Sequence, residues 1–253
     1  MIFSKKRDYC NLSFTWILAT LILLFFSCQN DGKRDIKDYY YPMDEWSEGR
    51  VYEYQPVNND SLPVEYWYFR KHVTDSATYM VGQFLDHSFN VRQFFSEEIV
   101  SNGVLMNEYS IYEYDSTGTP FKRSAEILAP NSFPFKVTDS TGVFLFKLKW
   151  QHPTIADAYL EFVRNRRFWG DAAYSFKGKS YDCVEFRVKE LVDDFNNGHL
   201  EPALEGKELY AKNLGLVYYM KKEIENNFVL EYELKDTFSM ETFEQKLKTY
   251  LGE

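Results

Sequence analysis

The sequence predicts an all-β or β-rich α+β domain: one strongly curved antiparallel sheet, a half-barrel, with a C-terminal helix. The first observation is composition, because the 253-residue chain carries 20 Tyr and 22 Phe and aromatic residues favour strands. The second is a succession of apolar segments joined by short turns rich in Asn, Asp, Ser and Gly, which is typical of antiparallel hairpins. The third is one amphipathic stretch with helical spacing at the end of the chain.

Residues 1–27 have the layout of a secretory signal peptide. Basic residues at 5–7 precede an apolar run over 16–26, and the small residue Ser27 stands before Cys28. A basic segment, a short apolar core and a small residue at the cleavage point are typical of signal peptides. The run is shorter than the ~20 apolar residues of a transmembrane helix, although an uncleaved membrane anchor is an alternative.

Cys28 resembles the lipid-attachment cysteine of bacterial lipoproteins. Their pattern is Leu, a small residue, Ala or Gly, then Cys; Phe25 and Phe26 depart from it, and only Ser27 is small. The resemblance implies that Cys28 carries several acyl chains, which anchor a protein stably to a membrane. Gln29 stands where an inner-membrane retention signal would have Asp, which favours the outer membrane. The alternative is an ordinary signal peptide in which Cys28 has no role.

We divide the remaining chain into a lipidated tether over 28–40 and a single antiparallel β domain over 41–253. The whole chain has a net charge of −9, and removal of residues 1–27, with three basic residues and one acidic residue, makes it −11. An acidic surface repels phosphate backbones, so nucleic acid is not expected as a partner.

The first half of the domain is expected to form strands separated by polar turns. Residues 51–55 alternate with period two, and Ser101-Asn102-Gly103 is a strong hairpin signal between two long segments. Pro130 and Pro134 interrupt the pattern that follows. The strands expected here are 51–55, 64–73, 78–85, 91–100, 104–114 and 124–128.

The second half is expected to continue the same sheet. Gly215 lies inside one of its segments and marks a bulge or a close backbone approach. The strands expected here are 143–150, 159–163, 181–191, 208–220 and 227–234.

A C-terminal helix is predicted over 239–251. Ser239 is a suitable N-cap, and Phe243, Leu247 and Leu251 form an apolar stripe at helical spacing. If this stripe packs into the concave face of the sheet, it fills that face. If it packs outside, an apolar cavity is left, and the wealth of aromatic residues favours this second arrangement.

No motif for catalysis or metal binding is present. The chain contains no G-x-S-x-G, H-E-x-x-H, P-loop or C-x-x-C motif. We therefore expect no enzyme activity, no catalytic residue, no metal and no cofactor. The four histidines, none at zinc-ligand spacing from another, are His72, His87, His152 and His199.

Three further features have simple structural interpretations. Asp86 and His87 are interpreted as a loop pair at the end of a strand. Cys183 is expected to be buried in a strand and inert, because reactive thiols need basic, exposed surroundings. The basic and aromatic cluster over 165–169 (NRRFW) is interpreted as a solvated turn, with contact to an anionic ligand as the alternative.

The closing part of the chain resembles a family. The segment 208–217 (ELYAKNLGLV) and the later 231–234 (EYEL) resemble the closing hairpin of uncharacterised periplasmic proteins built on a curved antiparallel sheet. Those proteins are similar in fold to the carrier and receptor proteins of the lipoprotein-localisation pathway. The match covers about the last third of the domain, and residues 41–54 fit the family's first strand. It implies a fold, and fold does not fix function.

These observations lead to two functional hypotheses. The first is a non-enzymatic lipoprotein of the cell envelope, anchored through Cys28, that binds a lipid or other apolar ligand in the concave face of its sheet. The alternative is a structural or assembly lipoprotein that binds another envelope protein through a sheet edge.

Overall fold

The computed structural model describes residues 32–59, 61–115, 117–138, 142–152, 155, 157–195, 199–200 and 203–252. Within it, Arg34–Glu253 forms one compact unit. The predicted signal peptide over 1–27 and Cys28 lie outside the described residues. The buried core residues of the described part lie within this unit, which residues 29–253 contain in full.

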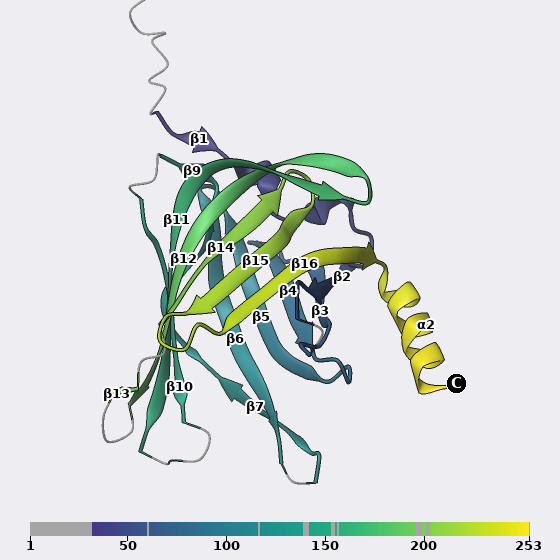
Figure 1. Ribbon diagram of the computed structural model, residues 1–253, viewed down its shortest axis with the longest axis vertical. Coiled ribbons are helices and arrows are strands. Elements are labelled where there is room, and N and C mark those ends of the chain that lie inside the picture. The colour runs from purple at the N-terminus through teal and green to yellow at the C-terminus, as the bar shows by residue number, and fades with distance from the viewer. Residues whose placement is uncertain are drawn as a thin grey trace, which may run out of the picture. The chain divides into compact units, whose positions relative to one another are not determined.

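Twelve antiparallel strands close into a barrel, so the expectation of a half-barrel is wrong (Figure 1). Each strand of the ring pairs with the next ring strand along the chain, and the last pairs back with the first. The ring strands are β2 (Arg50–Pro56), β3 (Glu65–Val73), β4 (Thr78–Leu85), β5 (Val91–Val100), β6 (Gly103–Tyr114), β8 (Glu126–Pro134), β10 (Phe144–Gln151), β11 (Tyr159–Phe176), β12 (Lys179–Phe195), β14 (Ala203–Ala211), β15 (Gly215–Glu223) and β16 (Val229–Phe238).

Short elements complete the unit. Two further strands attach to the ring, β7 (Pro120–Ser124) to β6 and β13 (His199–Leu200) to β12. Another pair, β1 (Arg34–Asp35) and β9 (Lys136–Val137), forms a separate two-stranded sheet. The short helices are η1 (Lys37–Tyr39) and η2 (Met43–Glu45), and the C-terminal helix is α2 (Met240–Leu251).

Local turn signals were reliable, whereas strand lengths were not. Val100 pairs with Gly103, which confirms the hairpin at 101–103. Pro130 and Pro134 do not interrupt a strand, because both lie inside β8. The β8–β10 ladder ends at Pro130, and the β6–β8 ladder ends at Pro134. The expected strand 159–163 extends to Phe176, because β11 pairs with β12 along its whole length.

Gly215 is a point of close approach, as predicted, but it begins a strand rather than lying inside one. The expected strand 208–220 is divided into β14 and β15 by a turn at 212–214, directly before Gly215. Gly215 has φ +90°, and a Cβ atom there would lie 2.4 Å from the ring of Tyr41. Only glycine fits both the left-handed backbone and the contact.

The segment from Arg34 to Trp46 covers one end of the barrel. Residues 34–40 were assigned to the tether, but Ile36 is fully buried and its backbone N–H donates to the Phe135 carbonyl at 2.8 Å. The Asn213 N–H, in the β14–β15 turn, donates to the Asp38 carbonyl at 2.8 Å. Apolar residues of this segment therefore belong to the interior core, and that end of the barrel is closed.

The helix α2 lies outside the ring of strands (Figure 1). Its predicted N-cap is confirmed, because the Ser239 hydroxyl accepts from the Thr242 backbone N–H at 3.2 Å. Phe243 is buried against Val51 and Phe238, in a cluster separate from the interior core, whereas Leu247 stays partly exposed. No helix among the described residues is long and apolar enough to cross a membrane.

Candidate ligand cavity

The barrel encloses a cavity of about 490 Å³. Because successive residues of a strand point to opposite faces, alternate residues of the ring strands face this space. Most of the lining is apolar and aromatic, and the large apolar side chains include Trp67, Phe69, Phe84, Phe95, Met106, Phe146, Leu148, Trp150 and Phe162. The volume lies within the ~300–1,000 Å³ typical of ligand pockets.

The cavity has a closed end and an open end. At the end covered by residues 34–46, the lining residues Tyr40, Met80 and Phe133 are almost fully buried. At the opposite end, where β10 turns into β11 and β15 into β16, the lining residues Trp150 and Leu230 are partly exposed. A ligand would therefore enter from the second end.

Arg164 and Lys221, two cations that line the cavity, form a triad with the buried Glu190 behind them. Arg164 of β11 donates from Nε to Glu190 Oε1 at 2.5 Å, and Lys221 of β15 places Nζ 2.9 Å from Glu190 Oε2. Burial alone would raise the pKa of Glu190, yet Arg164 and Lys221 hold it at about 2. Glu190 is therefore ionised, and the triad carries a net positive charge.

A second ion pair lies deeper and is self-contained. Arg166 donates from Nε to Glu208 Oε2 at 2.7 Å and from Nη2 to Glu208 Oε1 at 3.2 Å. Its Nη1 donates to the Ser132 carbonyl, and Nη2 also lies 3.3 Å from the Tyr210 hydroxyl. Burial would raise the pKa of Glu208, but Arg166 keeps it below its usual value. Each nitrogen of this guanidinium has a protein partner.

Two other cavity acids have hydroxyl partners instead of cations. Tyr40 donates to Glu97 Oε2 at 2.6 Å, and Tyr219 donates to Glu65 Oε2 at 2.5 Å. Burial raises the pKa of both carboxyl groups above its ordinary value. Both acids are therefore easier to protonate than Glu190.

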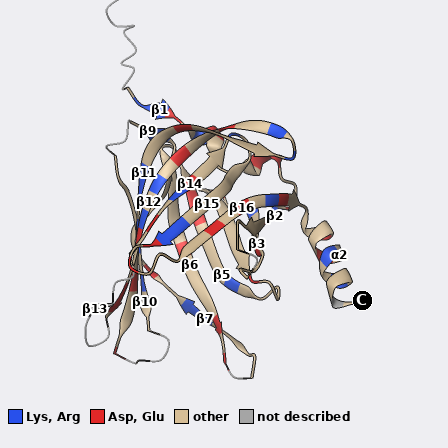
Figure 2. Cartoon of the chain, viewed as in Figure 1, with Lys and Arg blue, Asp and Glu red and all other residues tan. Residues whose placement is uncertain are grey.

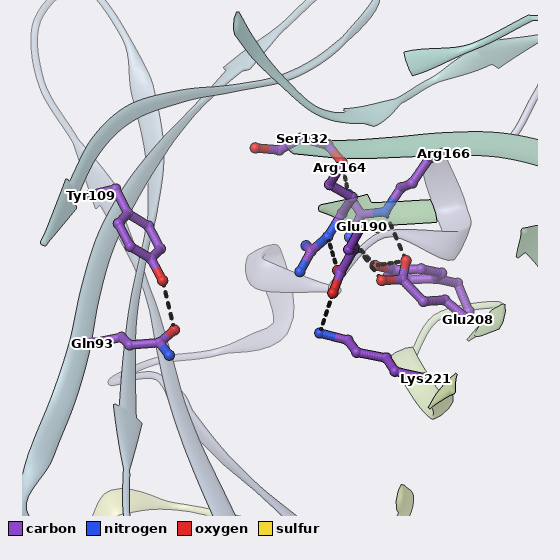
Figure 3. A network of polar contacts seen from close by, with 9 residues as sticks. Gln93, Tyr109, Ser132, Arg164, Arg166, Glu190, Glu208 and Lys221 are labelled. Carbon is purple, nitrogen blue, oxygen red and sulfur yellow. Dashed lines mark hydrogen bonds and ion pairs between the residues drawn. The ribbon is translucent and has the colours of Figure 1, made fainter. Parts of the chain in front are cut away.

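A polar pair faces the triad from the opposite wall. Tyr109 of β6 donates to Gln93 Oε1 of β5 at 3.0 Å. In Figure 3 this pair lies across an open space from Arg164, whose terminal nitrogens point toward that space. Figure 2 shows the interspersed acidic and basic residues of the strands that carry the ion pairs. The cavity thus combines an apolar lining with a few oriented polar groups, the usual composition of a small-molecule site.

Comparison with known proteins gives the fold. No protein family matches the chain, and no curated protein matches it. A crystal structure of "a putative lipoprotein from Parabacteroides distasonis ATCC 8503" matches with a TM-score of 0.52 and 13% identity, over 79% of this chain and 98% of that one. A "putative exported protein with YmcC-like fold" from Bacteroides fragilis NCTC 9343 matches with a TM-score of 0.51 and 12% identity, over 79% and 99%. This chain has a YmcC-like fold. At these identities the likeness shows the fold alone.

The structure overturns the interpretation of residues 165–169 as a solvated turn. The segment lies inside β11, and its residues alternate between the two faces of the barrel wall. Arg166 points into the cavity, while Trp169 is exposed on the outside, with the Arg187 guanidinium 5.1 Å from its ring centre. The alternative interpretation was contact with an anionic ligand. Arg166 does line a cavity, but its N–H donors are already bonded to Glu208, Ser132 and Tyr210.

The other single-residue predictions fall away from the cavity. Asp86 binds Arg92 Nε at 2.6 Å and the backbone of its own turn, which confirms the loop interpretation of Asp86-His87. Cys183 is buried in β12, and burial raises the pKa of its thiol to about 11. Its predicted inertness stays a prediction. In the described part of the chain, no three His, Cys, Asp or Glu side chains are grouped to hold a metal ion.

Sequence reasoning missed Arg164, Glu190, Glu208 and Lys221. A signal for two of them was present. Along β11, Phe162, Arg164, Arg166 and Phe168 share one face, and along β12 Glu190 shares a face with Val184, Phe186 and Val188. A charged residue on an otherwise apolar face indicates a buried ion pair. The pattern of one strand does not show which residue of another strand supplies the opposite charge.

Proposed function

We propose that this protein is a non-enzymatic lipoprotein of the cell envelope that binds an apolar or amphiphilic small molecule inside its barrel. One observation carries the proposal: α2 packs outside the barrel, and an aromatic-lined cavity of about 490 Å³ is left open at one end. Burial of an apolar guest there would release water from apolar surface, which is the main driving force of such binding.

The proposed envelope location and lipid anchor are supported by the sequence and by the proteins of similar fold, not by the cavity. The predicted signal peptide and Cys28 favour export and lipid attachment, and Gln29 favours the outer membrane. The two proteins of similar fold carry the descriptions "lipoprotein" and "exported protein". The similarity to carrier and receptor proteins of the lipoprotein-localisation pathway stays a prediction from residues 208–234.

Catalysis has little support in the cavity. The described acidic and basic side chains that line it are held in ion pairs or bonded to hydroxyl groups, and no lining Ser or Lys is paired with a histidine base. The alternative function, capture of another protein through a sheet edge, has a narrower structural basis, because the ring strands pair with one another around the barrel. Residues 167–176 of β11, which pair with β12 but not with β10, still present an edge.

The binding function is tested with a fluorescent fatty-acid probe titrated onto residues 29–253. Wild type should bind saturably, and Leu230→Trp, at the open end of the cavity, should reduce binding by filling space. Leu145→Trp makes the same change at an exposed position and should bind like wild type. Absence of saturable binding in a folded wild-type protein would reject the function.

The anchor is tested separately by metabolic labelling with an acyl-chain analogue. The full chain should be labelled, and Cys28→Ala should not be. Equal labelling of the two chains would exclude lipid attachment at Cys28.

A further inference from the structure

The donors of the two cavity arginines are used very differently. Arg166 engages Glu208, the Ser132 carbonyl and Tyr210 through all three nitrogens. Arg164 donates to Glu190 through Nε alone, and its two terminal NH₂ groups make no hydrogen bond to any described residue. Because the guanidinium is a planar fork of donors, such a pair of free NH₂ groups matches the two oxygens of a carboxylate.

The charge around Arg164 is also incomplete. Arg164 and Lys221 share the single carboxylate of Glu190, whereas Arg166 and Glu208 neutralise one another. The remaining acids of the lining, Glu65 and Glu97, are bonded to hydroxyl groups rather than to these cations, as described above. The directly paired groups thus comprise three cations and two carboxylates. Burial raises the pKa of Glu65 and Glu97, so these two acids are protonated more readily than Glu190 and offset the extra positive charge less.

The surroundings of Arg164 are those of an amphiphile rather than of a free anion. Phe162 lies directly beside it, with the guanidinium carbon 5.1 Å from the ring centre. Trp150 and Leu148 line the same wall toward the open end. Across the cavity, Gln93 uses its carbonyl oxygen for Tyr109, and its amide NH₂ makes no hydrogen bond to any described residue. Polar donors therefore meet apolar walls within one cavity.

We propose that the cavity binds an acyl chain that ends in a carboxylate, with the carboxylate held by the free NH₂ groups of Arg164 and by Lys221. The chain packs against the aromatic side chains between this position and the open end. This inference rests on the proposed binding function and names its ligand class. The ligand's carboxylate would supply a second negative charge beside Arg164 and Lys221, which otherwise share the single carboxylate of Glu190.

The test compares dodecanoate with 1-dodecanol, which share a chain and differ in head group, by calorimetric titration onto residues 29–253. Wild type should bind dodecanoate at least about tenfold more tightly, because a charge-assisted hydrogen bond exceeds a neutral one by about that factor. Arg164→Gln should remove this preference and leave dodecanol binding unchanged. Acetate, which has the head group alone, should bind too weakly to measure.

The matched control is Arg167→Gln, three residues along the same strand but on the exposed outer face. It should keep the wild-type preference. Because Arg164→Gln leaves Glu190 with only Lys221, the double variant Arg164→Gln/Glu190→Gln, which removes both charges, guards against loss of fold. Circular dichroism verifies that each variant is folded.

The outcomes separate the two claims. If dodecanoate and dodecanol bind wild type equally, or Arg164→Gln keeps the preference, the carboxylate inference is overturned and the cavity still binds apolar ligands. If neither compound binds to folded wild type, the binding function itself fails. Acetate binding as tight as that of dodecanoate would also overturn the inference, because the site would then recognise an anion without a chain.

Discussion

Arg164 and Arg166 point into the same barrel from one strand, two residues apart, yet their surroundings differ. Arg166 lies toward the closed end, where a carboxylate, a carbonyl and a hydroxyl occupy its nitrogens. Arg164 lies toward the open end and keeps two donor groups free. In the closed half, the protein's own groups satisfy the hydrogen-bond donors of the buried arginine. In the open half, two NH₂ groups of Arg164 have no hydrogen-bond partner among the described residues. The difference separates the part of the interior that stabilises the fold from the part that is available for binding.

The largest expected effect is in the closed half. Glu208→Gln leaves the buried charge of Arg166 without a counter-charge, and we expect a loss of about 3–5 kcal/mol in the free energy of unfolding. Urea denaturation measures it. Glu205→Gln removes a carboxylate from the outer face of the same strand, where it pairs with Lys189 in solvent, and should change stability by about 0.5 kcal/mol or less. Similar losses in the two variants would remove the distinction between the halves.

The next effect is a pH dependence that comes from Glu190. Its pKa of about 2 in the folded state lies below the ~4.3 of an unfolded chain. Its contribution to stability is therefore fully present above pH ~4.3 and is lost as the pH falls toward 2, by about 2–3 kcal/mol in total. Glu190→Gln should flatten the stability profile in this window. An unchanged slope in that variant would show that the triad does not hold Glu190 ionised.

Glu97 should behave in the opposite way. Burial raises its pKa in the folded state, so its protonated form is favoured by folding, and stability is lost as the pH rises above ~4.3 toward the folded pKa. Glu97→Gln keeps a neutral group beside Tyr40 and should gain stability relative to wild type as the pH rises. The difference between the two unfolding curves, measured from pH 4 to 8, gives the sign directly.

The smallest effect concerns the ligand. Dodecanoate at about ten times its dissociation constant should stabilise wild type by about 1.4 kcal/mol. At that same concentration Arg164→Gln should show little stabilisation, whereas Arg167→Gln should match wild type. Thermal denaturation with and without dodecanoate measures the shift, and equal shifts in all three proteins would place the carboxylate elsewhere.

Local features of the fold could be predicted from the sequence, whereas closure could not. The cap at Ser239 and the hairpin at 101–103 depend on a few adjacent residues. Closure depends on strand tilt and stagger accumulated around the whole ring. It also requires β11 and β12 to pair over their entire length, and only the first part of β11 showed a clear apolar alternation. A curved sheet was therefore predicted, and its closure into a barrel was not.

The cavity was predictable in kind but not in its polar detail. Aromatic abundance indicated an interior with space for a guest, and the position of α2 confirms that this helix does not fill it. The acid that pairs with Arg164 comes from β12, the second cation on that acid comes from β15, and the acid opposite Arg166 comes from β14. These contacts join residues far apart in the chain, and the register between neighbouring strands brings them together. A single strand read alone does not contain that information.

The ring closes where its first and last strands meet, and this seam decides when the fold can form. Residues near Tyr52 in β2 pair with residues near Thr237 in β16, so the final ladder joins nearly opposite ends of the domain. Contacts of such high sequence separation form slowly, because a long loop must close first. Ion pairs cross this seam: Lys235 of β16 and Lys246 of α2 each place Nζ 2.9 Å from a carboxylate oxygen of Glu53 in β2. Phe243 of α2 also packs against Val51 of β2 and Phe238 of β16. During synthesis, which starts at the N-terminus, the barrel cannot close until β16 has been made, and the contacts of α2 then stabilise the β2–β16 pairing.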